Sequence, residues 1–268
     1  MLIDTHCHLD AAEFDADRAA ALQAARAGGV AGFLVPAVGA SNFEAVAALS
    51  ASHPDVVPAF GIHPMYVGQA QEGDLDLLQA RLAGGGAVAV GEIGLDGFVQ
   101  DGCMPLQLHY FEAQLRLAKA FELPVVLHVR RAQDEILKLL RRIRPPGGIA
   151  HAFNGSLQQA EAFIKLGFRL GFGGAMTYTG SRRIRQLAAD LPISAIVLET
   201  DAPDIPPAWG AGQRNDPANL PRFAEVLAQL RGMPVDEVVE ATGANALAAI
   251  PELRQLAGLR PASPPESR

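Results

Sequence analysis

Short apolar runs alternate with amphipathic segments along almost the whole chain. Eight of these runs have the length of a strand, and several are apolar nearly throughout, such as VVPAFGI, AVAVGEI and PVVLHV. Strands that are buried on both faces of a parallel sheet show this pattern, whereas half-buried strands alternate apolar and polar residues. We therefore predict parallel strands at residues 2–8, 31–38, 56–63, 87–95, 124–129, 148–153, 168–173 and 195–200.

Helical periodicity fills the intervals between these runs. Its two clearest stripes are Leu108, Phe111, Leu115 and Ala118, and Ile136, Leu139, Leu140 and Ile143. Residues at such a spacing lie on one face of a helix and pack against a core. Nearer the C-terminus, Asp216 followed by Pro217 predicts the start of a helix, and Gly232 predicts its end.

Eight strands that are each followed by a helix predict an α/β fold, a single (β/α)8 TIM barrel over residues 1–259. The alternative is an open doubly wound sheet, which normally carries a glycine-rich nucleotide loop after its first strand. The glycine-rich stretch nearest that position, GGVAG at 28–32, ends a helix and begins a strand instead. We expect the Pro- and Ser-rich residues 260–268 to form a disordered tail.

The charge of the chain bears on the kind of nucleic-acid or phosphate partner that it can bind. Lys and Arg number 22 and Asp and Glu number 29, which gives a formal net charge of −7. Non-specific binding in a long duplex groove needs clustered cations that displace counterions, so this balance disfavours such a groove. A small phosphate-binding site stays open, because bound metal ions would supply positive charge locally.

Nothing in the sequence points to secretion or to membrane insertion. The first residues, MLIDTHCHLD, have no basic region, and no apolar run reaches the ~20 residues of a membrane span. The two cysteines, Cys7 and Cys103, are too few for a disulfide framework. We expect a cytoplasmic protein without a membrane partner; its oligomeric state stays open, with a monomer among the options.

Polar side chains gather where the predicted strands end. In IDTHCHLD, His6 and His8 flank Cys7, and in an extended segment both imidazoles point to one face and the thiol to the other. A TIM barrel brings the C-terminal ends of its strands to one rim. Read in chain order, these ends carry His6, His8, His63, Glu92, His128, His151 and Asp201.

Each of these residues has a structural alternative when taken alone. A single strand histidine is more often a hydrogen-bonded core residue than a metal ligand, Glu92 could pair with a basic side chain, and Asp201 could cap a turn. Apolar strands do not carry so many polar groups at one rim without a partner for them. We therefore interpret six residues together as metal ligands: His6, His8, Glu92, His128, His151 and Asp201.

The size of this donor set indicates two metal ions rather than one. Four imidazoles and two carboxylates are too many for one tetrahedral centre with an open position. Two divalent ions about 3.5–4 Å apart, sharing a bridging carboxylate, are the usual arrangement for hydrolysing phosphate esters. Mixed nitrogen and oxygen ligation suits Zn²⁺, Mn²⁺ or iron and suits Mg²⁺ less well, so the sequence leaves the identity of the ions open.

Six motifs make the chain resemble the TatD-type metal-dependent deoxyribonucleases of the amidohydrolase superfamily. They are THCHLD, GIHP, GEIGLD, LPVVLHVR, HAFNGS and LETDAPD, and RNDPANL and TGANAL resemble the family's C-terminal signatures. The resemblance runs from Ile3 to Ile250 and implies a barrel-shaped divalent-metal hydrolase that acts on DNA ends and abasic sites. It also implies that His6, His8, Glu92 and Asp201 hold one metal, and that Glu92, His128 and His151 hold the second.

The chain departs from the family pattern at positions beside the expected ligands. Gly97 and Phe98 follow GEIGLD where the family often has an aromatic pair, Arg131 stands in HVRRA at a position that is often acidic, and Asn154 replaces a hydroxyl residue. Every expected metal ligand is kept, so the departures concern substrate contacts. They indicate a divergent subgroup whose preferred substrate need not be DNA.

The expected chemistry is hydrolysis by a metal-activated water. Asp201 would orient this water and take its proton, with Glu92 as the bridging carboxylate. His63 and Arg130 are candidate phosphate contacts, although a surface ion pair is an equal alternative for Arg130. The expected substrate is DNA or another phosphate ester. Hydrolysis of a C–O or C–N bond, such as an ester, lactone or aminoacyl-RNA linkage, is the alternative, and the complete ligand set argues against a non-catalytic binding protein.

A long loop at residues 202–218 carries the only tryptophan of the chain, Trp209. Long loops at barrel mouths often form lids or substrate walls. Trp209 could stack on a base or pack the loop down, and we favour packing.

Overall fold

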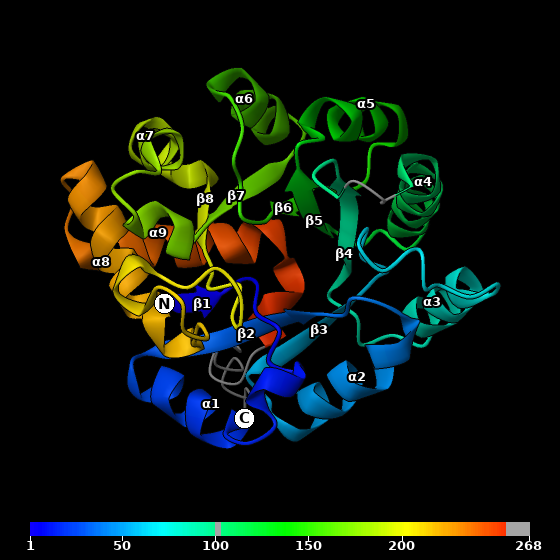
Figure 1. Ribbon diagram of the computed structural model, residues 1–268, viewed down its shortest axis with the longest axis horizontal. Coiled ribbons are helices and arrows are strands. Elements are labelled where there is room, and N and C mark those ends of the chain that lie inside the picture. The colour runs from blue at the N-terminus through cyan, green and yellow to red at the C-terminus, as the bar shows by residue number, and fades with distance from the viewer. Residues whose placement is uncertain (100–102, 256–268) are drawn as a thin grey trace, which may run out of the picture.

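Eight parallel strands form one sheet with the order β1 to β8 in the computed structural model, which describes residues 1–99 and 103–255 (Figure 1). Each strand pairs in parallel with the next one along the chain. The strands are β1 Leu2–Asp4, β2 Val30–Pro36, β3 Val56–Phe60, β4 Ala89–Asp96, β5 Val125–Arg130, β6 Gly148–Ala150, β7 Phe168–Phe172 and β8 Ile196–Leu198. This topology confirms the predicted TIM barrel.

The helices that follow the strands surround the sheet (Figure 1). They are α1 Arg18–Ala27, α2 Phe43–Ser52, α3 Asp74–Ala83, α4 Met104–Ala120, α5 Gln133–Ile143, α6 Leu157–Lys165, α7 Arg182–Asp190, α8 Leu220–Arg231 and α9 Val235–Ala249. The two predicted stripes are confirmed: the stripe on α4 packs into or against the outer core, and that on α5 is buried. Both α8 and α9 follow β8, so the last strand is followed by two helices instead of one.

The barrel closes through contacts between β8 and β1. The Thr5 N–H donates to the Leu198 carbonyl at 3.2 Å. Asp4, at the end of β1, accepts hydrogen bonds from the Thr200 hydroxyl at 2.6 Å and from the Thr200 N–H at 2.9 Å. Burial raises the pKa of Asp4 to about 7, against the lowering effect of these bonds. Asp4 therefore braces the barrel seam.

The apolar core has an outer part and an inner part. The outer part lies between the strands and the helices and includes Phe33, Phe111 and Phe163. The inner part joins residues of the strands, such as Val57 and Val126, to Ala249 and others at the end of α9 and in the short helix that follows it. Apolar side chains of the strands, α9 and the short helix after it thus fill part of the barrel interior, as is usual for this fold.

Several predicted strands extend beyond the strands in the structure. The predictions for residues 2–8, 56–63, 148–153 and 195–200 run past the ends of β1, β3, β6 and β8 by two to four residues. The backbone leaves the sheet ladder at these points but keeps hydrogen bonds to neighbouring strands and loops, for example from His63 N–H to the Val38 carbonyl in the loop after β2 and from His151 N–H to the Leu127 carbonyl on β5. His151 therefore follows β6 rather than lying in it, and the prediction that placed it inside the strand is wrong.

The start of α8 also differs from the prediction in detail. Asp216 acts as an N-cap and accepts a hydrogen bond from the Ala218 N–H at 2.9 Å, but the capped turn is a short 3₁₀ helix, Pro217–Asn219. Helix α8 begins only at Leu220. It ends where predicted, because Gly232 adopts a left-handed conformation with φ of 62°. The expected disordered tail at residues 260–268 lies outside the described residues.

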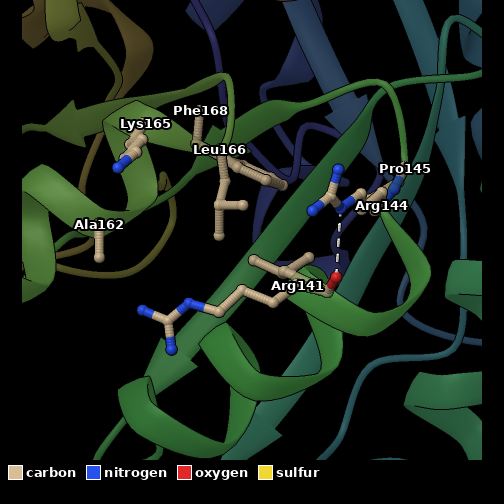
Figure 2. A pocket seen from close by; sticks show the side chains of 8 residues that line it. Arg141, Arg144, Pro145, Ala162, Lys165, Leu166 and Phe168 are labelled. Atoms are coloured by element: carbon tan, nitrogen blue, oxygen red, sulfur yellow. Dashed lines mark hydrogen bonds between the residues drawn. The ribbon is translucent and has the colours of Figure 1, made fainter.

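A cavity of about 510 Å³ opens on the outside of the barrel between α5 and α6 (Figure 2). Its lining combines apolar side chains such as Leu140 and Phe168 with the cations Arg141, Arg144 and Lys165. Phe168 begins β7 and the cations lie at the ends of α5 and α6, so the cavity is at the opposite end of the barrel from the predicted site.

Across residues 1–99 and 103–255, the structure has no helix with the length and apolar character needed to span a bilayer. Both cysteines are free: Cys7 is buried and Cys103 is exposed.

Candidate metal centre

The loop after β1 directs two imidazoles to one side. The Nε2 atoms of His6 and His8 lie 3.2 Å apart, while the Cys7 thiol is buried on the other side, 3.8 Å from the Leu34 carbonyl. This arrangement agrees with the prediction for an extended His-Cys-His segment. It leaves the thiol in the apolar core and both rings free to face a common partner.

That common partner is Glu92, which is buried on β4 and faces five imidazoles. Its Oε2 lies 3.1 Å from His6 Nε2 and 3.6 Å from His8 Nε2. Its Oε1 lies 3.2 Å from His63 Nε2, 3.0 Å from His128 Nδ1 and 3.1 Å from His151 Nε2. The two carboxylate oxygens therefore face two different groups of rings.

Asp201 completes the cluster from the loop after β8. Its Oδ1 lies 3.5 Å from His6 Nε2 and 3.7 Å from His8 Nε2. The Asp201 N–H donates to the His6 carbonyl at 2.8 Å, and its backbone adopts a left-handed conformation with φ of 58°, which aspartate tolerates better than most residues. The structure thus brings all six predicted ligands together, within reach of one another.

The chemistry of this donor set fits divalent cations. Its side chains form three groups whose ligand atoms lie within 4.8 Å of one another: His6, Glu92 and His151; His6, His8 and Asp201; and His63, Glu92 and His128. Five imidazoles around one carboxylate would repel one another if protonated, and would lack enough hydrogen-bond donors and acceptors if neutral. A divalent cation accepts the ring lone pairs and both carboxylate oxygens at once, so the residues present suit it.

Burial and close charged neighbours shift the pKa values of the side chains in the cluster. Burial raises the pKa of Glu92, but its electrostatic interactions with the neighbouring imidazoles and a hydrogen bond with His128 outweigh it and hold this pKa well below the usual value. Burial raises the pKa of Asp201 to about 7, although His151 and His8 lower it. For His8, burial lowers the pKa, but Glu92 and Asp201 together raise it to about 9.

Metal binding is therefore expected to release protons. At neutral pH the metal-free cluster is expected to carry protons, because Glu92 and Asp201 raise the pKa of His8 to about 9 and that of His151 well above its usual value despite burial, while burial raises the pKa of Asp201 to about 7. Metal ligands must be deprotonated, so binding should expel about two protons and affinity should rise steeply between about pH 6 and 9. Calorimetric titration with Mn²⁺ in buffers of different ionisation enthalpy measures this number; release of no protons would contradict the assignment of these rings as ligands.

Asp96 is a functional side chain that the sequence analysis missed. It is fully buried at the end of β4, and its Oδ2 accepts a hydrogen bond from His128 Nε2 at 2.9 Å. With the proton on Nε2, His128 offers the lone pair of Nδ1 to the cluster. A carboxylate that fixes the tautomer of a metal-binding histidine in this way strengthens the site. The only sequence signal was the position of Asp96 at the end of the GEIGLD strand.

Glu199 lies near the Nδ1 atom of His151, at a distance too long for a hydrogen bond. Its Oε1 lies 3.6 Å from His151 Nδ1 and accepts a hydrogen bond from the Ala152 N–H at 2.5 Å. Gly171 on β7 makes room for it, because a Cβ atom at this position would lie 2.1 Å from Glu199 Oε2. The sequence motif LETD contains Glu199, but only the neighbouring strand shows why the carboxylate is tolerated there.

His63 lies within the cluster but has the properties of a hydrogen-bond donor. The Met65 N–H donates to His63 Nδ1 at 3.2 Å, so in the neutral ring the proton resides on Nε2, which faces Glu92. Burial lowers the pKa of His63 and favours this neutral form. An N–H directed into the site suits an oxygen of the substrate better than a metal ion, so the substrate contact predicted for His63 remains our expectation.

Arg130 is the predicted site residue that the structure does not bring into direct contact with the cluster. Its Nη1 lies 3.9 Å from Asp96 Oδ2, and its side chain is half exposed at the end of β5. It reaches His128 only through the Asp96 carboxylate.

Trp209 is packed onto α8. Its indole N–H donates to Asn219 Oδ1 at 3.0 Å, and the guanidinium of Arg222 lies 3.8 Å above its ring. These contacts occupy one ring face and agree with the packing role that the sequence analysis favoured for Trp209.

Comparison with known proteins identifies the family. A family model described as TatD related DNase matches residues 3–250. The chain belongs to this family. The resemblance inferred from the motifs is thereby confirmed, and the chain is a metal-dependent hydrolase, as predicted.

Individual relatives agree with this membership. The TatD-family chain is 43% identical over 242 residues to the Escherichia coli K12 protein YjjV, an uncharacterized metal-dependent hydrolase, with 89% of this chain and 93% of YjjV covered. It is 32% identical over 268 residues to human deoxyribonuclease TATDN3, with 95% and 96% covered. The crystal structure of E. coli K12 YjjV matches with a TM-score of 0.90 at 41% identity, over 93% of this chain and 98% of that one.

Proposed function

We propose that this TatD-family hydrolase cleaves phosphodiester bonds in DNA with two divalent cations. The observation that carries the proposal is the orientation of Glu92, whose Oε2 faces His6 and His8 while its Oε1 faces His128 and His151. A carboxylate placed in this way can bridge two ions, and pairs of ions are the common device for hydrolysing phosphate esters. The name of the human relative, deoxyribonuclease TATDN3, supports DNA as the substrate class.

The residues divide between two positions in this proposal. His6, His8, Asp201 and Glu92 would hold the first ion, and His128, His151 and Glu92 would hold the second. The grouping of His6, His8 and Asp201 supports the first position, and the shared Glu92 in the other two groups, with His151 and with His128, supports its place between the positions. Asp96 then orients the imidazole of His128, and Glu199 lies beside that of His151.

When bound, the cations supply Lewis-acid polarisation of the phosphate and make water a nucleophile near neutral pH. The protein's own part in the reaction begins with Asp201. Its carboxylate faces the ring nitrogens of His6 and His8, which places it to orient the attacking water and to accept its proton. Burial raises the pKa of Asp201 to about 7, so this carboxyl exchanges a proton near neutral pH.

His63 would bind the phosphate that reacts. Its Nε2–H points into the cluster beside Glu92, so that it can donate to a non-bridging oxygen as negative charge develops there. The ring is buried and held by the Met65 N–H, which limits the reorganisation needed during the reaction.

The test is hydrolysis of end-labelled single-stranded DNA by the purified protein with added Mn²⁺ or Mg²⁺, beside carboxylic esters, lactones and amides. We expect turnover of the DNA that disappears with EDTA and returns with the metal. Metal-dependent turnover of an ester or amide panel without any cleavage of DNA would refute the proposal. Elemental analysis of the same preparation gives the number and identity of the bound ions.

A further inference from the structure

A group of charged and aromatic side chains beside the metal cluster has no part in the function described so far. Phe98 follows β4, and Arg130 and Arg131 end or follow β5. The guanidinium carbon of Arg130 lies 4.0 Å from the centre of the Phe98 ring, and that of Arg131 lies 4.6 Å from it. Phe98 is 47% exposed, and its ring makes cation–π contacts with two positive charges at the barrel mouth.

These two charges are poorly neutralised. Arg131 forms no ion pair or hydrogen bond within the described part of the chain. Arg130 reaches only Asp96 Oδ2, at 3.9 Å, and that carboxylate already accepts hydrogen bonds from the Phe98 N–H at 2.8 Å and from His128 Nε2 at 2.9 Å. Both guanidinium groups contact the Phe98 ring, and most of their N–H donors stay available for hydrogen bonds to a ligand.

The backbone holds this group in place. The Gly97 N–H donates to the Arg130 carbonyl at 2.7 Å, and a Cβ atom on Gly97 would lie 2.6 Å from the Arg131 carbonyl oxygen. Only glycine allows so close an approach between the two loops. The Asp96 carboxylate also accepts the N–H groups of Phe98 and Val99, so the carboxylate that orients His128 fixes the turn that carries the ring.

We infer that Arg130 and Arg131, supported by Phe98, bind a phosphate group of the substrate that flanks the scissile one. The inference rests on the proposed phosphodiesterase function and adds a determinant of specificity to it. Two guanidinium groups present paired donors that match phosphate oxygens. Arg130 contacts the Asp96 carboxylate that binds His128, and Arg131 shares the Phe98 ring with Arg130, so both lie beside the metal cluster rather than within it. The flanking phosphate is either a terminal phosphomonoester or the next phosphodiester of the strand.

The acidic balance of the chain agrees with a local contact of this kind. With a net charge of −7, the chain does not attract a long nucleic acid by its overall field. Two exposed arginines at the mouth of the site, of which Arg130 has only a long contact to Asp96 within the described residues, instead favour recognition of one phosphate close to the bond that is cut.

The test compares substrates that differ only in the flanking group. A dinucleoside monophosphate has the scissile phosphate alone; adding a terminal phosphate gives the first arm, and a trinucleotide gives the second. In the wild-type protein with saturating Mn²⁺, a flanking phosphate should raise kcat/KM about 10- to 100-fold, the range for hydrogen bonds to charged groups. The arm with the larger gain identifies the source of the phosphate.

The variants are Arg131→Gln and Arg130→Gln, with Phe98→Leu to remove the ring and keep both charges. The first two variants should reduce the ratio of kcat/KM with the flanking phosphate to kcat/KM without it toward one. Phe98→Leu should reduce this ratio in part. Arg141→Gln, the same change at an exposed arginine on the cavity between α5 and α6, should leave the ratio as in the wild type. All three arginines are exposed, so thermal unfolding should show that these variants fold.

Binding measured without metal separates this inference from the proposed function. In EDTA, fluorescence anisotropy with labelled oligonucleotides should show tighter binding of the probe with the extra phosphate, and Arg131→Gln should abolish that preference. Equal kcat/KM for substrates with and without the flanking phosphate, or a ratio unchanged in both arginine variants, would overturn the inference even if DNA is cleaved. A phosphate preference in EDTA without any phosphodiester cleavage would instead refute the proposed function, and it would leave the two arginines as a phosphate-binding pair with no scissile bond to flank.

Discussion

Replacing Asp201 by Asn is expected to lower kcat on DNA by about 10²- to 10⁴-fold, the contribution of a positioned general base. The amide has the size of the carboxylate and can still direct an oxygen toward His6 and His8, but it cannot accept the proton of the attacking water. The fold should be kept, because the backbone bond from Asp201 N–H to the His6 carbonyl does not involve the side chain. Single-turnover kinetics with saturating metal, together with thermal unfolding, measures both effects.

Asp204 provides the matched control. It lies in the same loop, three residues further on, and is exposed, so Asp204→Asn should leave turnover close to that of the wild type. If Asp201→Asn kept near wild-type turnover at full metal occupancy, Asp201 would not be the base. A loss of turnover that additional Mn²⁺ restores would assign Asp201 to metal binding alone.

Replacing Glu92 by Gln is expected to remove metal as well as activity. Both oxygens of Glu92 face imidazoles, and the amide offers one oxygen and one N–H donor in their place. One side of the cluster then loses a ligand and gains a group that repels a cation. We expect no more than about one ion per chain by elemental analysis and a loss of about 10³-fold or more in turnover, since transition-state charge loses its stabilisation.

The control for this variant is Glu161→Gln, the same change at an exposed position on α6. It should bind as many ions as the wild-type protein. Two tightly bound ions in Glu92→Gln would refute the bridging role of this carboxylate and leave the partition of the ligands without support.

The sequence predicted the barrel and the ligand set for a physical reason that is visible in single residues. Runs such as PVVLHV on β5 are apolar on both faces because helices cover one side of the sheet and the barrel interior the other, so His128 is conspicuous among them. The strand ends were predicted less well. The segments after β1 and β6 keep a strand-like sequence while their backbone leaves the sheet ladder, and this depends on hydrogen bonds to strands and loops that are distant in sequence.

Asp96, Glu199 and Arg131 could not be assigned from the sequence. Asp96 is 32 residues from His128, and Glu199 is 48 residues from His151, so neither spacing has a local meaning. A carboxylate at a strand end is equally compatible with a cap, an ion pair or a metal ligand. Its role is set by which ring atom of another strand lies beside it.

The order of the elements, the all-apolar strands and the set of imidazole and carboxylate donors were determined by the sequence, because periodicity and residue chemistry are local properties. The tertiary structure alone decided that the two oxygens of Glu92 face different rings, that His63 presents an N–H, and that Arg130 and Arg131 share the ring of Phe98. These features depend on ångström-scale distances across the barrel mouth. Such distances arise only when eight strands close on one another.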